Sequence, residues 1–407
     1  MSGNNDSYNL REIFQQMELD LIASLKRNFY RHKNEELKEG FQWEQWQLSK
    51  LRNIEKYRKQ NEKIVGKYSD PIQKTIDNVL NESFKAGENR VTKLINQIKS
   101  WLGKYKRKEA VIEFPTNISS NKSEIPGMEK LKDIISRVIN KPKNNSLPQE
   151  NNFFGMNDKK LKALTDSVQH DINVGQHSVL RKMDDVYRQT IFKTQVYMQS
   201  GATSLNQAID MATKDFLDAG INSIVYKDGK RVNIAAYAEM ALRTASQRAT
   251  FLGEGKKRDE WGLHLVVVSA HANTCKLCLP WQGNILIDDV FSSGSKADGD
   301  YPLLSEAMKA GLLHPNCRHT LITYFPGITQ LPKVPEEDTI NKNYESEQKQ
   351  RYMERQIRKY KRIEAGELDK SNVQKASGKV SEWQARLRQH LKDNPQLRRD
   401  NWREQIK

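Results

Sequence analysis

Long apolar runs are missing from this chain of 407 residues, and hydrophobic residues make up only 37% of it. No stretch approaches the roughly 20 apolar residues that a membrane-spanning helix needs. Residues 1–6 carry no basic side chain, and the apolar segment of a secretory signal does not follow them. We therefore expect no membrane span, no secretory signal and a protein that is made and kept in a cytoplasm.

Cysteine is also scarce, and acidic residues are outnumbered. The three cysteines are an odd number, which argues against a disulfide framework. The chain has 67 Lys and Arg against 51 Asp and Glu, a net charge of +16. Such an excess favours a polyanionic partner, nucleic acid or anionic lipid. A soluble protein that is merely basic is the alternative.

The N-terminal region, residues 1–108, is predicted to be helical. Apolar residues recur there at three- and four-residue steps from Ile13 to Phe29, which is typical of an amphipathic helix. Asp70-Pro71 resembles the start of another helix, with proline at its first position. A packed helical bundle and an oligomerisation arm are both open. Residues 109–160, rich in Pro, Ser and Asn, are predicted to be a linker that contains a short helix.

Residues 161–330 are predicted to form a compact α+β domain, and residues 331–407 a basic helical tail. From residue 341 the tail has 18 Lys and Arg against 10 Asp and Glu, an excess of eight. The fold class is therefore mainly α with a smaller α+β domain. The expected elements of that domain are helices at 171–198, 205–217, 235–251 and 303–310, a hairpin at 224–234 around Asp228-Gly229, and strands at 263–268, 285–287 and 321–325.

All three cysteines lie in one stretch, together with several histidines. Cys275 and Cys278 form a C-x-x-C pair, and Cys317 follows about 40 residues later within a segment that contains His314 and His319. Thiolate and imidazole groups in two short segments separated by a loop are typical of a tetrahedral zinc site. Four protein ligands would close the site and make it structural, whereas three would leave a position open for water.

The most economical ligand set is Cys275, Cys278 and Cys317, completed by His314 or His319. His271 is a further candidate just upstream. The alternative is that the cysteines are buried core residues without metal. A thioredoxin-like redox pair fits less well, because that motif begins a helix and Pro280 and Gly283 disfavour a helix here. The loop between the two segments, residues 288–301, is predicted to be flexible and polar.

In its motifs and their order, the chain resembles the minor capsid proteins of tailed phages, a family related to the head morphogenesis proteins typified by the F protein of phage Mu. The resemblance covers roughly residues 171–405. It rests on Tyr237-Ala238-Glu239-Met240 with Arg243-Thr244, Ser269-Ala270-His271, Trp281-Gln282-Gly283, His314-Pro315-Asn316-Cys317-Arg318-His319-Thr320, Phe325-Pro326-Gly327, Arg351 to Arg362 and Trp383-Gln384-Ala385-Arg386.

This resemblance implies a structural protein of the virion, not an enzyme. It implies a position in the head interior or at the portal vertex, with the portal protein and other capsid or scaffolding proteins as partners. The implied role is in head assembly or DNA delivery. The basic tail suits contact with double-stranded DNA, since affinity for DNA is dominated by Lys and Arg that neutralise phosphates. No sequence feature indicates base readout, so we expect contact without sequence specificity.

Two other classes of function compete with this reading. A metal-dependent hydrolase or nuclease could use the Cys/His cluster at 271–319, but it needs an open metal position and a general base. Glu239 and Asp288 are candidates for that base by residue type alone. A toxin-like effector is a third possibility. It would need a toxin domain, whereas only the helical tail is expected after residue 330.

Overall fold

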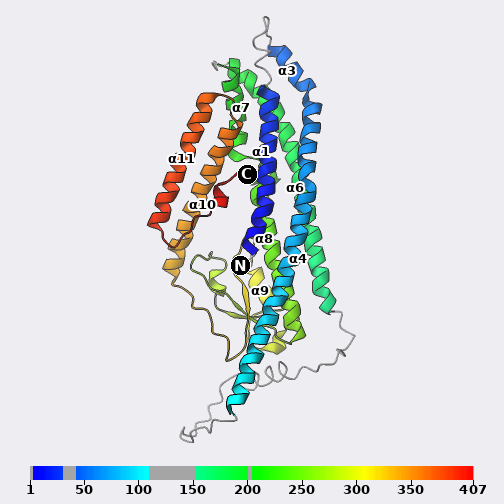
Figure 1. The fold of residues 1–407 in the computed structure, drawn as a ribbon, viewed down its shortest axis with the longest axis vertical. Coiled ribbons are helices and arrows are strands. Elements are labelled where there is room, and N and C mark those ends of the chain that lie inside the picture. The colour runs from blue at the N-terminus through cyan, green and yellow to red at the C-terminus, as the bar shows by residue number, and fades with distance from the viewer. Residues whose placement is uncertain (1–2, 31–42, 110–152, 200–203, 407) are drawn as a thin grey trace. The chain divides into compact units, whose positions relative to one another are not determined.

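The computed structural model describes residues 3–30, 43–109, 153–199 and 204–406 (Figure 1). Residues 110–152 of the predicted linker lie outside this part of the chain. The described elements are α1 (Gly3–Tyr30), α3 (Trp43–Arg52), α4 (Ile54–Glu109), α6 (Phe153–Gln199), α7 (Leu205–Ala219), β1 (Ile224–Val225), β2 (Arg231–Val232), α8 (Ile234–Glu260), β3 (Leu265–Val268), η1 (Leu279–Trp281), β4 (Ile285–Ile287), η2 (Lys296–Asp298), α9 (Leu304–Lys309), β5 (Leu321–Thr323), α10 (Glu337–Gly366), α11 (Lys370–Asp393) and η3 (Asn401–Glu404). The chain is mainly helical with a small antiparallel sheet, which confirms the predicted fold class.

The residues pack into two units, and each unit is built from separate stretches of the chain. Unit 1 comprises Met1–Asp77, Ser167–Arg243 and Glu345–Lys407, and unit 2 comprises Asn78–Asp166 and Thr244–Tyr344. Several long helices, α4 among them, contribute residues to both. The domain boundaries predicted at 108, 160 and 330 rest on local sequence composition and pattern alone. They stay a prediction. Among the described helices, none has an apolar stretch long enough to cross a membrane.

Unit 1 is a helical bundle around apolar side chains. One face of α1 is buried over the described side chains from residue 9 onward, with Phe14, Met17 and Leu21 fully buried. The Tyr187 ring of α6 stacks on Tyr57 of α4, with centroids 4.3 Å apart, and also contacts Phe29. Burial of such a stripe is what the three- and four-residue spacing predicts. In this region the chain forms a packed helical bundle, one of the two alternatives predicted from the sequence.

The C-terminal residues are part of unit 1. Helices α10 and α11 lie side by side (Figure 1) and bury Ile357, Val380 and Leu387 between them. The Arg362 guanidinium donates to the carbonyls of Leu217 and Asp218 at the end of α7, at 3.0 and 2.7 Å. The predicted tail is therefore helical, as expected, and folded against other helices.

The turn between α10 and α11 is held by a buried carboxylate of α7. Asp210 accepts the backbone N–H of Leu368 at 2.7 Å and of Asp369 at 3.0 Å, together with the side-chain amide of Asn372. A carboxylate that accepts backbone N–H groups fixes a turn more strongly than a neutral acceptor would. This contact joins residues more than 150 positions apart in the sequence.

Several local predictions for residues 204–234 are confirmed. Helix α7 begins after Ser204, whose side chain accepts the N–H of Gln207, and ends at Gly220 with φ +67°. Strands β1 and β2 pair antiparallel around the turn at Asp228-Gly229, where Gly229 has φ +79°. The capping and turn residues in the sequence were therefore sufficient to predict the ends of α7 and the position of the hairpin.

Two helix boundaries were predicted wrongly. Pro71 lies inside α4, which runs unbroken from Ile54 to Glu109, and does not begin a helix. Proline removes one backbone hydrogen bond inside a helix, but the packing of Ile72 and Ile76 in the core keeps the helix continuous there. Helix α6 begins at Phe153, well before the predicted start at residue 171, and residues 153–160 at the end of the predicted linker are part of this helix.

Unit 2 contains the sheet, in the order β4-β3-β5, with both outer strands antiparallel to β3. The predicted strands therefore form, and the central residues Val266, Val267 and Val268 are fully buried. A further cluster packs Val91, Ile95 and Ile98 of α4 against Leu263 and Phe325. The loop after β4 was expected to be flexible, yet Asp288 and Asp259 hold it through several hydrogen bonds.

Candidate metal centre

Two short turns at one end of the sheet carry the cysteines. Strands β4 and β5 both run antiparallel to β3, and Ile285 and Leu321 pair with residues at the end of β3. The turn at 275–278 comes shortly before β4, and the turn at 314–317 comes shortly before β5. The sheet register therefore brings both turns to the same end, although about 40 residues separate them.

The two turns are built alike. The N–H of Cys278 donates to the carbonyl of Cys275 at 3.2 Å, and the N–H of Cys317 donates to the carbonyl of His314 at 2.9 Å. Asn316, within the second turn, has φ +65°, a left-handed conformation that asparagine tolerates well. Each turn therefore offers its first and fourth side chains as candidate ligands.

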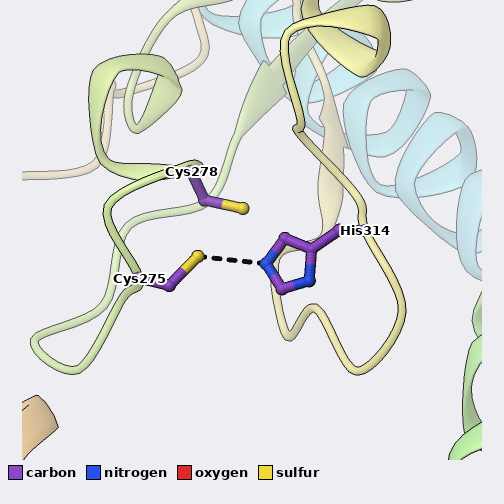
Figure 2. Close-up of side chains that lie close together, drawn as sticks. All are labelled: Cys275, Cys278 and His314. Carbon is purple, nitrogen blue, oxygen red and sulfur yellow. Dashed lines mark hydrogen bonds between the residues drawn. The ribbon is translucent and has the colours of Figure 1, made fainter. Parts of the chain in front are cut away.

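The candidate ligand atoms converge. The Sγ of Cys275 lies 3.0 Å from Nε2 of His314, and the Sγ of Cys278 lies 3.7 Å from the Sγ of Cys317. Figure 2 shows Cys275, Cys278 and His314 pointing toward one another. In the described part of the chain, two groups of three ligands form, and Cys278 belongs to both: one adds Cys275 and His314, and the other adds Cys317 and His319.

The two histidines have different surroundings. Nδ1 of His314 lies 2.8 Å from the carbonyl of Pro315, so a proton on Nδ1 leaves Nε2 free to face the sulfur of Cys275. The ring of His319 is fully buried, with Nδ1 3.3 Å from the Sγ of Cys317. Its Nε2 contacts Thr274 Oγ1 at 3.1 Å and Gln282 Oε1 at 3.2 Å. Both imidazoles are thus held by a second partner.

His271 stays apart from the sulfur atoms. Its ring packs against that of His319, with centroids 4.2 Å apart, and its backbone N–H donates to Gln282 at 2.8 Å. Burial and the nearby His319 lower its pKa. Neither group of converging ligands in the described residues includes it. Of the six predicted ligands, the structure brings five into two overlapping groups that share Cys278, and it leaves His271 as their neighbour.

The contact between Cys278 and Cys317 shifts the pKa values of the two thiols in opposite directions. The hydrogen bond from Cys278 and the imidazole of His319 outweigh burial and lower the pKa of Cys317 to about 4. The contact with Cys317, followed by burial, raises the pKa of Cys278 well above its ordinary value. The contact therefore favours the ionised form of Cys317 over that of Cys278.

The first turn shows the same kind of pairing. Burial alone would raise the pKa of Cys275, but the backbone N–H groups of Cys278 and Leu277 and the contact with His314 lower it. Burial would lower the pKa of His314, but Cys275 and the carbonyl of Pro315 raise it. A set of sulfur and imidazole donors at these distances can hold a borderline-soft cation such as Zn²⁺.

The two carboxylates considered as general bases are engaged in other contacts. Asp288 is fully buried, accepts Arg258 Nη2 at 2.7 Å and also accepts the N–H of Phe291. Glu239 belongs to unit 1 and accepts guanidinium groups from Arg11 and Arg243 at 2.6 and 2.5 Å. A general base must reach the proton that it removes, so these contacts give the hydrolase hypothesis no support.

Thr274 and Gln282 are the site residues that the sequence analysis did not single out for this role. They fix the ring of His319 from the side opposite the sulfur atoms. The only signal for Thr274 is its position directly before Cys275. Gln282 lies within the Trp281-Gln282-Gly283 motif that carried part of the family resemblance.

Comparison with known proteins establishes the family. Residues 5–123 and 127–392 match the model of a family described as phage minor capsid protein 2. The chain belongs to this family. A structural protein of Lactococcus phage LL-H is 27% identical to it over 254 residues, covering 60% of this chain and 67% of that protein. A structural protein of Lactococcus phage mv4 is 36% identical over 101 residues, or 24% of this chain and 82% of that protein.

This family match confirms the resemblance and extends it. It includes the N-terminal helices from residue 5, which the motifs did not cover. No solved structure matches the chain. Membership in a family of minor capsid proteins agrees with the expected virion location and favours a structural role over an enzymatic one.

Proposed function

We propose that this protein is a minor component of the phage head that lies at the portal vertex and contacts the packaged DNA without reading its sequence. Its partners are the portal protein and other capsid or scaffolding proteins. Family membership supports the role in the head. The observation that carries the DNA contact is the exposed, basic surface of α11.

Helix α11 has six Lys and Arg against two acidic residues, Glu382 and Asp393. Lys379 and Arg386 both pair with Glu382, at 2.7 and 2.6 Å. Within the described residues, the four other basic side chains of the helix make no ion pair and are exposed: Lys370, Lys375, Arg388 and Lys392. Unpaired cations on a solvent-facing helix can neutralise phosphates and release counterions from DNA.

The folded state of residues 345–407 decides how this proposal can be tested. Removing them would take away the partners of Asp210 and the contact of Gln15 with the carbonyl of Gln405 at 2.9 Å. A truncated protein would lose DNA affinity and stability together. Point substitutions on the exposed face of α11 separate the two effects.

The test replaces Lys370, Lys375, Arg388 and Lys392 of α11 by Gln, which keeps a good helix former at each position. We expect weaker binding to mixed-sequence duplex DNA, and a slope of log K against log salt that is smaller by up to about 3–4, roughly 0.9 per lost phosphate contact. Fluorescence anisotropy across a salt series measures both. The melting temperature should stay unchanged.

The matched control removes four exposed charges from α4 of the same unit: Lys56, Lys59, Lys63 and Lys74, each replaced by Gln. Equal losses in both variants would show that net charge alone drives DNA binding, against a specific role of α11.

For the portal contact, the chain is co-expressed with the portal protein of the same phage. Co-elution with the portal oligomer is expected, and separate elution would contradict the portal assignment.

A further inference from the structure

We propose that Cys275, Cys278, His314 and Cys317 bind one Zn²⁺ ion in a closed, structural site in unit 2, and that His319 positions Cys317 without binding the ion. This proposal concerns stability within the unit and is independent of DNA or portal contact. Its chemistry is that of a Cys3His site, in which four protein ligands leave no open position for a reacting water.

Two of the distances fit this ion, and because Cys317 lies outside the converging group of Cys275, Cys278 and His314, its sulfur would have to move toward them on binding. Zn–S bonds of about 2.3 Å in a tetrahedron place two sulfur atoms about 3.8 Å apart. The Sγ atoms of Cys278 and Cys317 are 3.7 Å apart, close to that edge. The sulfur-to-nitrogen distance of 3.0 Å between Cys275 and His314 is shorter than the ~3.6 Å of a tetrahedral edge. Binding of the ion would therefore widen that contact by about half an ångström.

The choice of His314 over His319 rests on what each ring already contacts. Nε2 of His314 points at Cys275, while the carbonyl of Pro315 holds its Nδ1, as is usual for a zinc-bound imidazole. The ring of His319 is enclosed by Cys317, Thr274 and Gln282. The backbone N–H of His319 also lies 3.5 Å from the Sγ of Cys317, which suits a residue that orients a ligand.

The equivalence of the two turns is a second argument. Each has the spacing ligand-x-x-ligand, and each is closed by an N–H from its fourth residue to the carbonyl of its first. Short turns of this kind let two donors share one ion. The set with His314 uses both ends of both turns, whereas His319 lies beyond the second turn, at the approach to β5.

The ion would join the two connections that enter β4 and β5. Strands in this sheet have only three or four residues, so few backbone hydrogen bonds hold the sheet together. Because a preformed site does not exist in the unfolded chain, the free energy of zinc binding adds to that of folding. We therefore expect unit 2 to depend on the ion for its stability.

The experiment uses the full chain, purified without a histidine tag from zinc-containing medium. Elemental analysis should find about one zinc per chain, and Co²⁺ substitution should give the absorption of a tetrahedral site with several thiolate ligands. A chelator should lower the melting temperature and expose the three cysteines to alkylation. Folded protein that contains no zinc would overturn the proposal, whether or not its buried cysteines react.

Substitutions test the ligand set. Cys275→Ser, Cys317→Ser and His314→Ala should each lose the zinc, whereas His314→Cys should keep it, because four thiolates also form a structural site. His319→Ala should still hold one zinc, bound about 10–100-fold more weakly, as expected when an outer partner is lost. The exposed His177 provides the control variant, His177→Ala, which should behave as the unmodified chain.

Two outcomes would overturn the assignment of ligands. If His319→Ala loses the zinc while His314→Ala keeps it, His319 is the fourth ligand. If both variants keep the zinc and the Co²⁺ spectrum is unchanged in each, neither histidine binds the ion. Should a variant fail to fold, the cysteine alkylation of the unmodified chain with and without chelator still decides whether the metal is there.

Discussion

Each of the two units of this protein is stabilised by a different kind of internal contact. In unit 1, long helices bury continuous apolar stripes, such as Phe14, Met17 and Leu21 of α1. In unit 2, strands of three or four residues alternate with loops, and single buried polar side chains fix the loops in place. A long amphipathic helix spreads its stabilisation over many contacts, whereas a small sheet with long connections depends on a few. Single substitutions should therefore cost more in unit 2.

The largest expected effect is at Arg258, a fully buried residue of unit 2. Its guanidinium lies 2.7 Å from Asp288 and 3.5 Å from Glu254. Arg258→Met leaves the buried Asp288 without a counterion and leaves Glu254 paired with Arg90 alone, which should cost about 3–5 kcal/mol of the free energy of unfolding. Denaturant titration measures the loss, and hydrogen exchange should localise it to residues 244–344.

The control for Arg258 is an exposed basic residue of unit 1. Lys379 pairs with Glu382 at the surface of α11, and Lys379→Met should leave the unfolding midpoint nearly unchanged, because exposed ion pairs are screened by solvent. If the two substitutions had similar effects, the Arg258 contacts would not be a main support of unit 2.

Two glycines of α4 sharpen the comparison, because alanine should have opposite effects at them. A Cβ at Gly87 would overlap the carbonyl oxygen of Thr250 on α8, while a Cβ at Gly66 would meet nothing within 4 Å. Gly87→Ala should destabilise by about 1–3 kcal/mol through overpacking. Gly66→Ala should stabilise by up to ~1 kcal/mol through helix propensity. Thermal unfolding followed by circular dichroism measures both, and equal signs would contradict the close approach of the helices in unit 2.

An effect that depends on pH is expected at Glu367 in unit 1. Burial, followed by the nearby Asp210 and Asp369, raises the pKa of Glu367 to about 7. Its charge therefore costs stability increasingly as pH rises from the ordinary value of about 4.5 through 7, and costs nothing below that ordinary value. Glu367→Gln should raise the melting temperature at pH 8 and lose this advantage near pH 4.5. The exposed Glu345→Gln serves as the control, and an equal gain there would contradict the role of burial.

Local signals in the sequence predicted much of the fold. Ser204 and Gly220 mark the ends of α7, and Asp228-Gly229 marks the hairpin, because caps and turns depend on residues within a few positions. Pro71 was misread for the same reason. The local rule favours a helix start, but the packing of the helix on both sides of it decides the outcome.

The candidate site was predictable as a set of residues but not as an arrangement. The spacing of Cys275, Cys278 and Cys317 was enough to single out the cluster. The choice between His314 and His319 depends on Thr274 and Gln282, which face the ring only after the sheet has formed. Likewise, the excess of Lys and Arg in the tail could be counted in the sequence. The contact of Arg362 with the carbonyls at the end of α7 could not be predicted from it.

The contact between Gln15 and the carbonyl of Gln405 spans 390 positions, and it has a consequence for synthesis. The helices of unit 1 that leave the ribosome first cannot complete their packing until residues 345–407 have also emerged. Contacts of such long sequence separation form late and slowly, and exposed apolar helix faces in the meantime invite misassociation. Completion of unit 1 thus requires translation through the C-terminal helices, so that prematurely terminated chains lack a finished unit 1.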